Sequence, residues 1–294
     1  MTSSDDGSWL RTLPPAGGRA PVLTRAGHRV LAGHRLSELV QGRPPGITGH
    51  QWSTASREGF DLVVCDEDTG RPVVAVEIGP AVAPGSPAQR AERMKSTVSA
   101  AVGLPVLRVE SPTLRAADHG RRLVEYVLDA RRYAAVTTTP VTGEADEPDA
   151  VGFREILGRL PDGRTGHVND LGALARAAAV EAYVSRRLAD PIVRGLHVRW
   201  TGGPAEGWSW VEVRPGACLV ERVSVWEHRF TCGVDPAQLA EDLAVVALGE
   251  RLRDLDAAER ELISRDALRT EILGLRERRD EFVDGFAFEH LCAD

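Results

Sequence analysis

The sequence predicts an N-terminal α/β domain, with a mixed sheet flanked by helices, followed by a C-terminal α+β domain. Three short runs in the first half, residues 60–65, 72–78 and 104–110, are nearly all apolar and rich in β-branched side chains. Such continuous apolar character is typical of strands that helices cover on both faces. Beyond residue 150 the pattern changes to alternating strands and then to leucine-rich helix. With 294 residues, the chain is long enough for two domains.

The N-terminal domain is expected over residues 21–136. Residues 1–20 are rich in Ser, Asp, Gly and Pro, which predicts a flexible arm. Residues 22–40 indicate a strand end and a short helix, and the Gly and Pro content of residues 42–46 indicates a turn. The three apolar strands then follow this turn.

Two helices complete the domain. One is expected over about residues 87–102, between the second and third strands, and the other over about residues 116–133. Apolar residues at helical spacing predict the inner face of the first helix: Ala91, Met94, Val98 and Ala101. The order strand, strand, helix, strand, helix defines one α/β domain.

Residues 137–150 have the composition of a linker, and an α+β domain of unknown role is expected over residues 151–294. A helix is predicted near residues 169–188, and three β-rich runs between residues 195 and 232 suit an antiparallel meander. From residue 239 the chain reads as helix almost to its end. The leucines there slip out of strict heptads, so an interface for a homodimer or a protein partner and a plain intramolecular core both stay open.

One residue type is almost missing from the chain. Lysine occurs once, at Lys95, whereas arginine occurs 35 times. A GC-rich coding bias explains the exchange of surface lysines for arginine, but not the survival of one lysine. Arginine keeps its proton and is a planar fork, whereas lysine is a compact charge on a flexible stem. Lys95 is therefore a candidate for a role that arginine cannot fill.

Charge is distributed unevenly along the chain. The net charge is −7, yet residues 1–60 hold seven arginines and four acids, whereas residues 241–294 hold eight arginines and fifteen acids. An acidic protein does not attract DNA by its overall field. The basic N-terminal part could still bind nucleic acid locally.

The sequence predicts a cytoplasmic protein without a membrane segment. No apolar run follows a basic stretch at the start, and no run approaches the length of a membrane span. The four cysteines form no C-x-x-C pair and are expected to be buried free thiols in a reducing compartment: Cys65, Cys218, Cys232 and Cys292. Nucleophile motifs of the G-x-S-x-G type and a phosphate-binding loop are absent.

Two stretches carry a family resemblance. FDLVVCDEDTGRPVVAVEIG, followed by RAERMKSTVSAAVGLPVLRV, resembles the restriction-endonuclease-like PD-(D/E)XK superfamily, and most closely the bacterial family called domain of unknown function 2726. The shared features are an apolar strand with an Asp, a second strand ending in Glu, a helix with a lysine, and a GLPVLRV strand. The resemblance covers about residues 22–135 and implies a restriction-endonuclease-like fold.

The resemblance implies a metal-dependent phosphodiesterase, an endonuclease acting on DNA. Asp61 and Glu77, with the backbone carbonyl of Ile78, would bind Mg²⁺, with Mn²⁺ as the alternative ion. Most of the superfamily has a lysine two residues after the Glu, where this chain has Gly79. The resemblance therefore assigns the catalytic cation to Lys95, which would reach across from the helix.

Other readings of the same residues stay open. Asp61 could be an ordinary strand-end acid, Glu77 could pair with an arginine, and Lys95 could be a solvated helix residue. The module would then be a catalytically degenerate one that binds nucleic acid or a protein partner. A third alternative is a sensor or scaffold that acts through residues 151–294. Convergence of the Asp61 and Glu77 carboxylates with the Lys95 amine favours the nuclease, and a Lys95 in bulk water favours the binding module.

Overall fold

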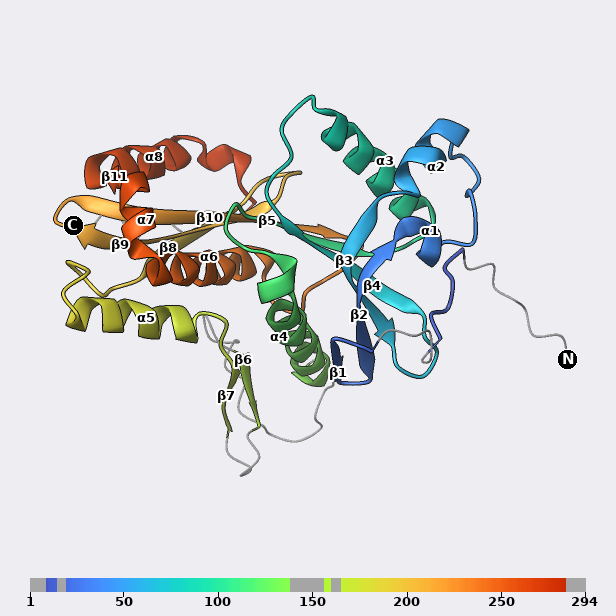
Figure 1. Cartoon of the computed structure of the whole chain (residues 1–294), viewed down its shortest axis with the longest axis horizontal. Helices are drawn as coiled ribbons and strands as arrows, with labels where there is room; N and C mark the ends of the chain where they lie inside the picture. Colours follow the sequence, from blue (N-terminus) through green and yellow to red (C-terminus); the bar gives the residue numbers. More distant parts are fainter. Residues whose placement is uncertain (1–8, 15–19, 138–155, 160–164, 284–294) are drawn as a thin grey trace, which may run out of the picture. The chain divides into compact units, whose positions relative to one another are not determined.

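The computed structural model describes residues 9–14, 20–137, 156–159 and 165–283 (Figure 1). The chain divides into two compact units. The first comprises residues 1–128 and 227–231, and the second comprises residues 129–226 and 232–294. The sequence predicts that the first domain ends at residue 136. In the structure the first segment of the first unit ends eight residues earlier, at residue 128, inside a helix. Of the predicted linker, residues 138–150 lie outside the described part of the chain.

The first unit contains a mixed sheet, as the sequence predicts. Its strand order is β1-β2-β3-β4-β5, with antiparallel pairing from β1 to β4 and parallel pairing of β4 with β5. The strands are β1 (Leu23–Arg25), β2 (His28–Arg35), β3 (Gly59–Asp66), β4 (Pro72–Gly79) and β5 (Val106–Glu110). The last three coincide with the three apolar runs, and β1 with β2 adds a hairpin at the edge.

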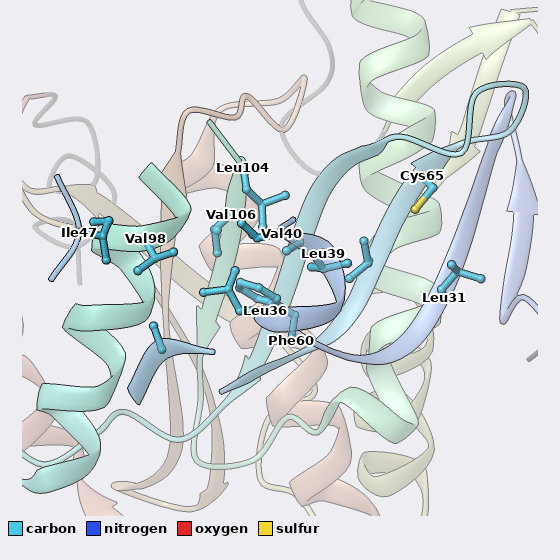
Figure 2. Close-up of a cluster of buried hydrophobic side chains, with 13 residues drawn as sticks. Leu31, Leu36, Leu39, Val40, Ile47, Phe60, Cys65, Val98, Leu104 and Val106 are labelled. Carbon is cyan, nitrogen blue, oxygen red and sulfur yellow. The ribbon is translucent and has the colours of Figure 1, made fainter. Parts of the chain in front are cut away.

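Helices cover both faces of this sheet. They are α1 (Leu36–Leu39), α2 (Gly49–Ala55), α3 (Pro87–Ala101) and α4 (Ala116–Thr137). One face packs on α1, α2 and α3 through a cluster that includes Phe60, Val98 and Leu104 (Figure 2). The other face packs on α4, where a Cβ on Gly120 would lie 2.8 Å from a methyl carbon of Leu62. The absence of a side chain at this glycine lets α4 approach the sheet.

The inner face of α3 differs from the expected one. The fully buried residues of this helix are Lys95, Val98 and Ser99, and Met94 packs at the edge of the core, whereas Ala101 is exposed. The helix is thus rotated so that Lys95 lies within the buried face instead of beside it. A lysine in that position requires a negatively charged partner nearby.

Helix α2 is an element that the sequence analysis did not predict. Thr48 begins it as N-cap: its side chain accepts from the Gln51 N–H at 3.2 Å, and the Gln51 side chain accepts from the Thr48 N–H at 2.9 Å. This reciprocal pair is a capping box. The T-x-x-Q spacing was the available signal for this helix.

Part of the expected N-terminal arm is attached to the first unit. Leu10 forms a bridge with Val40, and the backbone N–H of Leu13 donates to the Gly70 carbonyl at 2.8 Å. The Arg11 side chain donates to the Val40 carbonyl at 3.1 Å. Residues 9–14 are therefore hydrogen-bonded to the folded unit, in contrast to the flexible arm expected over residues 1–20, and the other parts of that arm, 1–8 and 15–19, lie outside the described residues.

The second unit contains an antiparallel meander of three strands, as expected: β8 (Arg194–Arg199), β9 (Ala205–Arg214) and β10 (Ala217–His228), whose pairing runs to Val225. A short β11 (Ile263–Ser264) pairs with the start of β10. A separate two-stranded sheet pairs β6 (Ile156–Arg159) antiparallel with β7 (Thr165–Asn169).

Helices pack on both faces of the meander. Helix α6 (Pro236–Arg253) and α5 (Ala173–Val184) cover one face, and α8 (Arg265–Glu277) covers the other. Strand β11 interrupts the continuous helix expected from residue 239, between α7 (Leu255–Ala258) with its 3₁₀ turn Glu259–Glu261 and α8. A second 3₁₀ turn spans Arg279–Glu281. Leucines of this helical end, such as Leu248, Leu252 and Leu275, are buried in the unit's own cores, which favours the intramolecular reading.

Gly207 on β9 is required for the close approach of α6. A Cβ at this position would lie 2.1 Å from the backbone of Ala240 and Glu241, a distance that no side chain tolerates. We expect Gly207→Ala to lower the free energy of unfolding by about 1–3 kcal/mol through overpacking. The control is Gly274→Ala on α8, where a Cβ meets nothing within 4 Å. That control is expected to be neutral or to stabilise by up to about 1 kcal/mol. Denaturant unfolding measures both, and equal values for the two variants would contradict the packing argument.

The described cysteines are buried free thiols, as predicted: Cys65, Cys218 and Cys232. Cys292 lies outside the described residues. Cys65 belongs to the hydrophobic core of the first unit (Figure 2). Burial raises the pKa of the Cys65 thiol to about 11, against a weaker opposing effect of the Arg29 charge.

The raised pKa makes Cys65 unreactive in the folded protein. We expect iodoacetamide at pH 8 to label Cys65 only after unfolding, because the thiolate is the reactive form. Peptide mass spectrometry measures the labelled fraction, and rapid labelling of the native protein would contradict this prediction. The same pKa shift makes the stability of the fold depend on pH. Since the thiol ionises near pH 9.0 when unfolded and near 11 when folded, its contribution to stability is lost as the pH rises between these values.

Candidate active site

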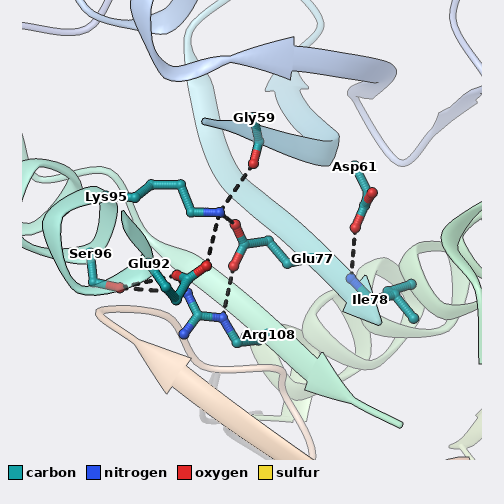
Figure 3. Close-up of polar contacts among 8 residues, drawn as sticks. All are labelled: Gly59, Asp61, Glu77, Ile78, Glu92, Lys95, Ser96 and Arg108. Carbon is teal, nitrogen blue, oxygen red and sulfur yellow. Dashed lines mark hydrogen bonds and ion pairs between the residues drawn. The ribbon is translucent and has the colours of Figure 1, made fainter. Parts of the chain in front are cut away.

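The candidate site lies where β3 and β4 separate. These strands pair in register as far as Leu62 opposite Val76. At the next residue of β3, Asp61, the hydrogen bond to β4 is made by the side chain instead of the backbone. The Asp61 Oδ2 accepts a hydrogen bond from the Ile78 N–H at 2.8 Å (Figure 3). The Asp61 carboxylate is thereby fixed beside the end of β4, next to the residue that follows Glu77.

Lys95 reaches the same end of the sheet from α3. Its Nζ donates to Oε1 of Glu77 in a close ion pair and to the Gly59 carbonyl at 3.1 Å (Figure 3). It also lies 3.3 Å from Oε2 of Glu92, one helical turn back on α3. The ammonium stands 5.0 Å from the centre of the Phe60 ring. Lys95 is only 5% exposed, so these acceptors replace its water.

Arg108 on β5 contacts the same two carboxylates. Its Nε donates to Oε2 of Glu77 at 2.8 Å, and its Nη2 forms a close ion pair with Oε1 of Glu92. Glu77, Lys95, Glu92 and Arg108 therefore form a closed set, which we call the charge ring, in which each cation touches both carboxylates (Figure 3). Two positive and two negative groups balance in a largely buried position.

The carboxyl groups near the ring are shifted toward their neutral forms. Atoms at the strand end partly desolvate the Asp61 carboxyl and raise its pKa, although the residue as a whole is exposed. The Ile78 hydrogen bond opposes this, the Glu77 charge adds to it, and Lys95 opposes it. Burial, followed by the Glu77 charge, raises the pKa of Glu92 against the opposing effects of Lys95 and Arg108. Such shifted groups concentrate at functional sites.

His228 belongs to the segment 227–231 that returns to the first unit. Desolvation lowers the pKa of His228, and the Arg108 charge lowers it further, whereas the Glu77 charge raises it. The field of the charge ring therefore extends to this imidazole.

The structure brings Lys95 and Glu77 into contact and places Asp61 beside the end of β4. Lys95 and Glu77 are in direct contact and Lys95 is buried, so the alternative reading of a solvated Lys95 is wrong. Asp61 lies at the same strand end, where its carboxylate accepts a hydrogen bond from the Ile78 N–H. The charges of Glu77 and Lys95 both affect the pKa of Asp61. The alternative reading of Glu77 as an arginine partner also holds, because Arg108 occupies its second oxygen.

Sequence reasoning missed three members of the cluster: Glu92, Ser96 and Arg108. Glu92 had a signal, since it precedes Lys95 by one helical turn and neighbours at that spacing share a face. Arg108 belongs to the GLPVLRV stretch, but its contact depends on the parallel register that sets Glu77 opposite Arg108. Ser96 lies 3.5 Å from Arg108 Nη2 and from Glu92 Oε1, at the edge of the ring.

Carboxylate and carbonyl oxygens are the ligands that a hard divalent cation prefers. Within the described residues no group of three or more His, Cys, Asp or Glu side chains could hold a metal ion. Mg²⁺, however, often takes only one or two protein carboxylates and completes its shell with water and phosphate oxygens. Asp61 has one oxygen bonded to Ile78. Both oxygens of Glu77 contact cations, so a metal ion at Glu77 would share an oxygen with Lys95 or Arg108, or replace one of these contacts.

Comparison with known proteins agrees with the sequence resemblance. Residues 29–126, a third of the chain, match the model of a family described as protein of unknown function (DUF2726). This confirms the predicted likeness to that family over the segment that contains the charge ring and Asp61. The chain matches no curated protein and no solved structure. In the part of the chain that the structure describes, no helix is long and apolar enough to cross a membrane.

Proposed function

We propose that the first unit is a metal-dependent phosphodiesterase of the PD-(D/E)XK superfamily that cuts DNA as an endonuclease. The observation that carries this proposal is a buried Lys95 paired with Glu77 near the end of β4, with Asp61 hydrogen-bonded to the next residue of the same strand. Burial of the Lys95 ammonium has a desolvation cost that its ion pairs must offset, so a buried lysine is weak evidence for a role in stability. The mixed sheet with helices on both faces is compatible with a restriction-endonuclease-like fold.

The proposed ligands are Asp61, Glu77 and the backbone carbonyl of Ile78, with Mg²⁺ as the ion and Mn²⁺ as the alternative. When bound, the ion would lower the pKa of a water molecule and stabilise the charge that develops on the phosphate. Asp61 is positioned for this by its hydrogen bond to the Ile78 N–H, which holds the carboxylate against the end of β4.

Lys95 is the proposed catalytic cation. Its ammonium is held by the Gly59 carbonyl and by two carboxylates, so it is oriented before any substrate binds. A preorganised cation offsets negative charge on a phosphate without the cost of reorganisation at the moment of reaction. Glu92 acts as a positioning residue, because it contacts the ammonium from the same helix.

Incubation of the purified full chain with nucleic acid tests this proposal. Supercoiled circular DNA detects an endonuclease, and linear duplex DNA, single-stranded DNA and RNA run in parallel define the substrate class. We expect nicking of the circular DNA with Mg²⁺ or Mn²⁺ and none with EDTA. A folded protein that leaves all four substrates intact with both ions would contradict the proposal.

The pairing of both Glu77 oxygens with cations supports a second candidate function. This arrangement suits a catalytically degenerate module binding nucleic acid or a protein partner. A gel-shift experiment separates the two candidates. Binding of DNA without cleavage, unchanged by EDTA, would favour the degenerate module, whereas metal-dependent cleavage excludes it.

A further inference from the structure

The charge ring offers a metal ion no vacant oxygen on Glu77. Oε1 is taken by Lys95, and Oε2 accepts from Nε of Arg108 at 2.8 Å. The Glu77 side chain is 11% exposed, so water contributes little to its solvation. A divalent cation that binds through Glu77 must therefore share an oxygen with Lys95 or Arg108, or replace one of these contacts.

Each cation of the ring keeps other contacts if Glu77 turns away. Lys95 Nζ retains the Gly59 carbonyl and Glu92 if Glu77 turns away, and it stands over the Phe60 ring. The Nε of Arg108 is bonded to Glu77, whereas its Nη2 reaches Glu92 and Ser96. Arg108 can thus lose the hydrogen bond from Nε to Glu77 and keep its contacts through Nη2.

Charge balance points to the same contact. The ring is neutral as it stands, with two carboxylates facing two cations. Addition of a doubly charged ion to a largely buried neutral set is opposed by the positive charges already there. Since Arg108 is the cation on Oε2, its charge and its hydrogen bond both oppose a metal at that oxygen.

We propose that Arg108 is an internal counter-ion that competes with the divalent cation for Oε2 of Glu77. This inference rests on the proposed function and describes how its metal site is regulated. With Arg108 in place the site binds metal weakly, and removal of the Arg108 charge opens it. Arg108 is a positioning residue in this scheme, since it acts through Glu77.

Manganese binding to the full-length protein tests the competition directly. Free Mn²⁺ is measured by its electron paramagnetic resonance signal, which needs neither substrate nor activity. We expect Arg108→Gln to bind Mn²⁺ about tenfold more tightly than the wild type, because one charge-assisted hydrogen bond to Glu77 is lost. The matched control is Arg93→Gln, which removes the same charge from an exposed residue of α3 that contacts Gln89. The control is expected to bind Mn²⁺ as the wild type does.

The outcomes separate this inference from the proposed function. Equal affinity of the wild type and both variants would overturn the competition while leaving the metal site standing. Weaker binding by Arg108→Gln would also overturn it, since Arg108 would then support the site. Absence of Mn²⁺ binding in all three proteins would overturn the metal site and the competition together.

The single lysine supplies a second test that needs no variant. Selective ¹³C labelling of lysine gives one side-chain signal in nuclear magnetic resonance, that of Lys95. Since Lys95 shares Glu77 with Arg108, entry of diamagnetic Mg²⁺ at Glu77 must change the surroundings of the ammonium. We expect a saturable shift of this signal with Mg²⁺. Calorimetric binding of Mg²⁺ with an unchanged Lys95 signal would show that the ring stays closed and would overturn the inference.

Discussion

Replacement of Asp61 by alanine is expected to lower Mg²⁺-dependent DNA cleavage by about 100-fold or more. Asp61 is the proposed ligand with no ion pair to a cation of the ring, and its carboxylate is already fixed by the Ile78 N–H. The fold is expected to survive, because Asp61 is exposed and gives up one hydrogen bond worth about 1 kcal/mol. Initial rates of plasmid nicking and a thermal melt of the same preparation measure the two effects.

The matched control for this variant is Asp66→Asn, at the opposite end of β3. Asp66 accepts hydrogen bonds from the Thr69 backbone and hydroxyl, in a turn remote from the charge ring. This control is expected to cut DNA at the wild-type rate. If Asp61→Ala cuts DNA as fast as Asp66→Asn does, Asp61 has no part in the chemistry and the nuclease assignment is wrong.

Replacement of Glu77 by glutamine is expected to lower the free energy of unfolding by about 3 kcal/mol. The change keeps the shape of the side chain but leaves Lys95 and Arg108 with one shared carboxylate, Glu92. Removal of one partner from a buried ion pair is costly because the remaining charge is desolvated. In a thermal melt of a chain of 294 residues this corresponds to a fall of roughly 5 °C.

The chain provides a control for this prediction. Arg25 and Glu125 form an ion pair at 2.9 Å whose side chains are 39% and 32% exposed. Glu125→Gln makes the same chemical change there and is expected to cost less than about 1 kcal/mol, since exposed pairs contribute little. Equal losses for Glu77→Gln and Glu125→Gln would show that the ring is not a buried electrostatic unit.

A double substitution tests the coupling within the ring. Lys95→Met removes the other charge of the close pair and keeps an apolar stem of similar length. Each single change leaves one charge of the Lys95–Glu77 pair without its partner, whereas the double change removes both charges. Glu77→Gln combined with Lys95→Met is therefore expected to lose less stability than the sum of the two single changes. Additive losses would contradict direct coupling between Glu77 and Lys95.

The sequence predicted those parts of the fold whose signal is local. The three apolar runs became β3, β4 and β5, since continuous β-branched character identifies a buried strand without knowledge of its neighbours. The β-rich runs 195–202 and 208–215, the first with clear alternation, likewise predicted β8 and β9. Helix α2 was missed because its seven residues are too few to show an apolar period, and its capping box was the only local signal.

The site was predictable to the extent that single residues were unusual. Lys95 was conspicuous as the only lysine, and Asp61 and Glu77 occupy strand ends. The contact of Glu77 with Arg108 depends on the parallel register of β4 and β5, which tertiary packing sets and a local pattern does not encode. For the same reason the rotation of α3 that buries Lys95 was not visible from the spacing of its apolar residues.

The most direct test of a metal site at Asp61 and Glu77 is a calorimetric titration of Mg²⁺ and Mn²⁺ into the full chain, run beside the Asp61→Ala variant. The account predicts saturable binding of either ion by the wild type that is lost in Asp61→Ala, with melting curves showing both proteins folded. Binding that persists undiminished in Asp61→Ala would contradict the account, because the ion would then be held by other residues.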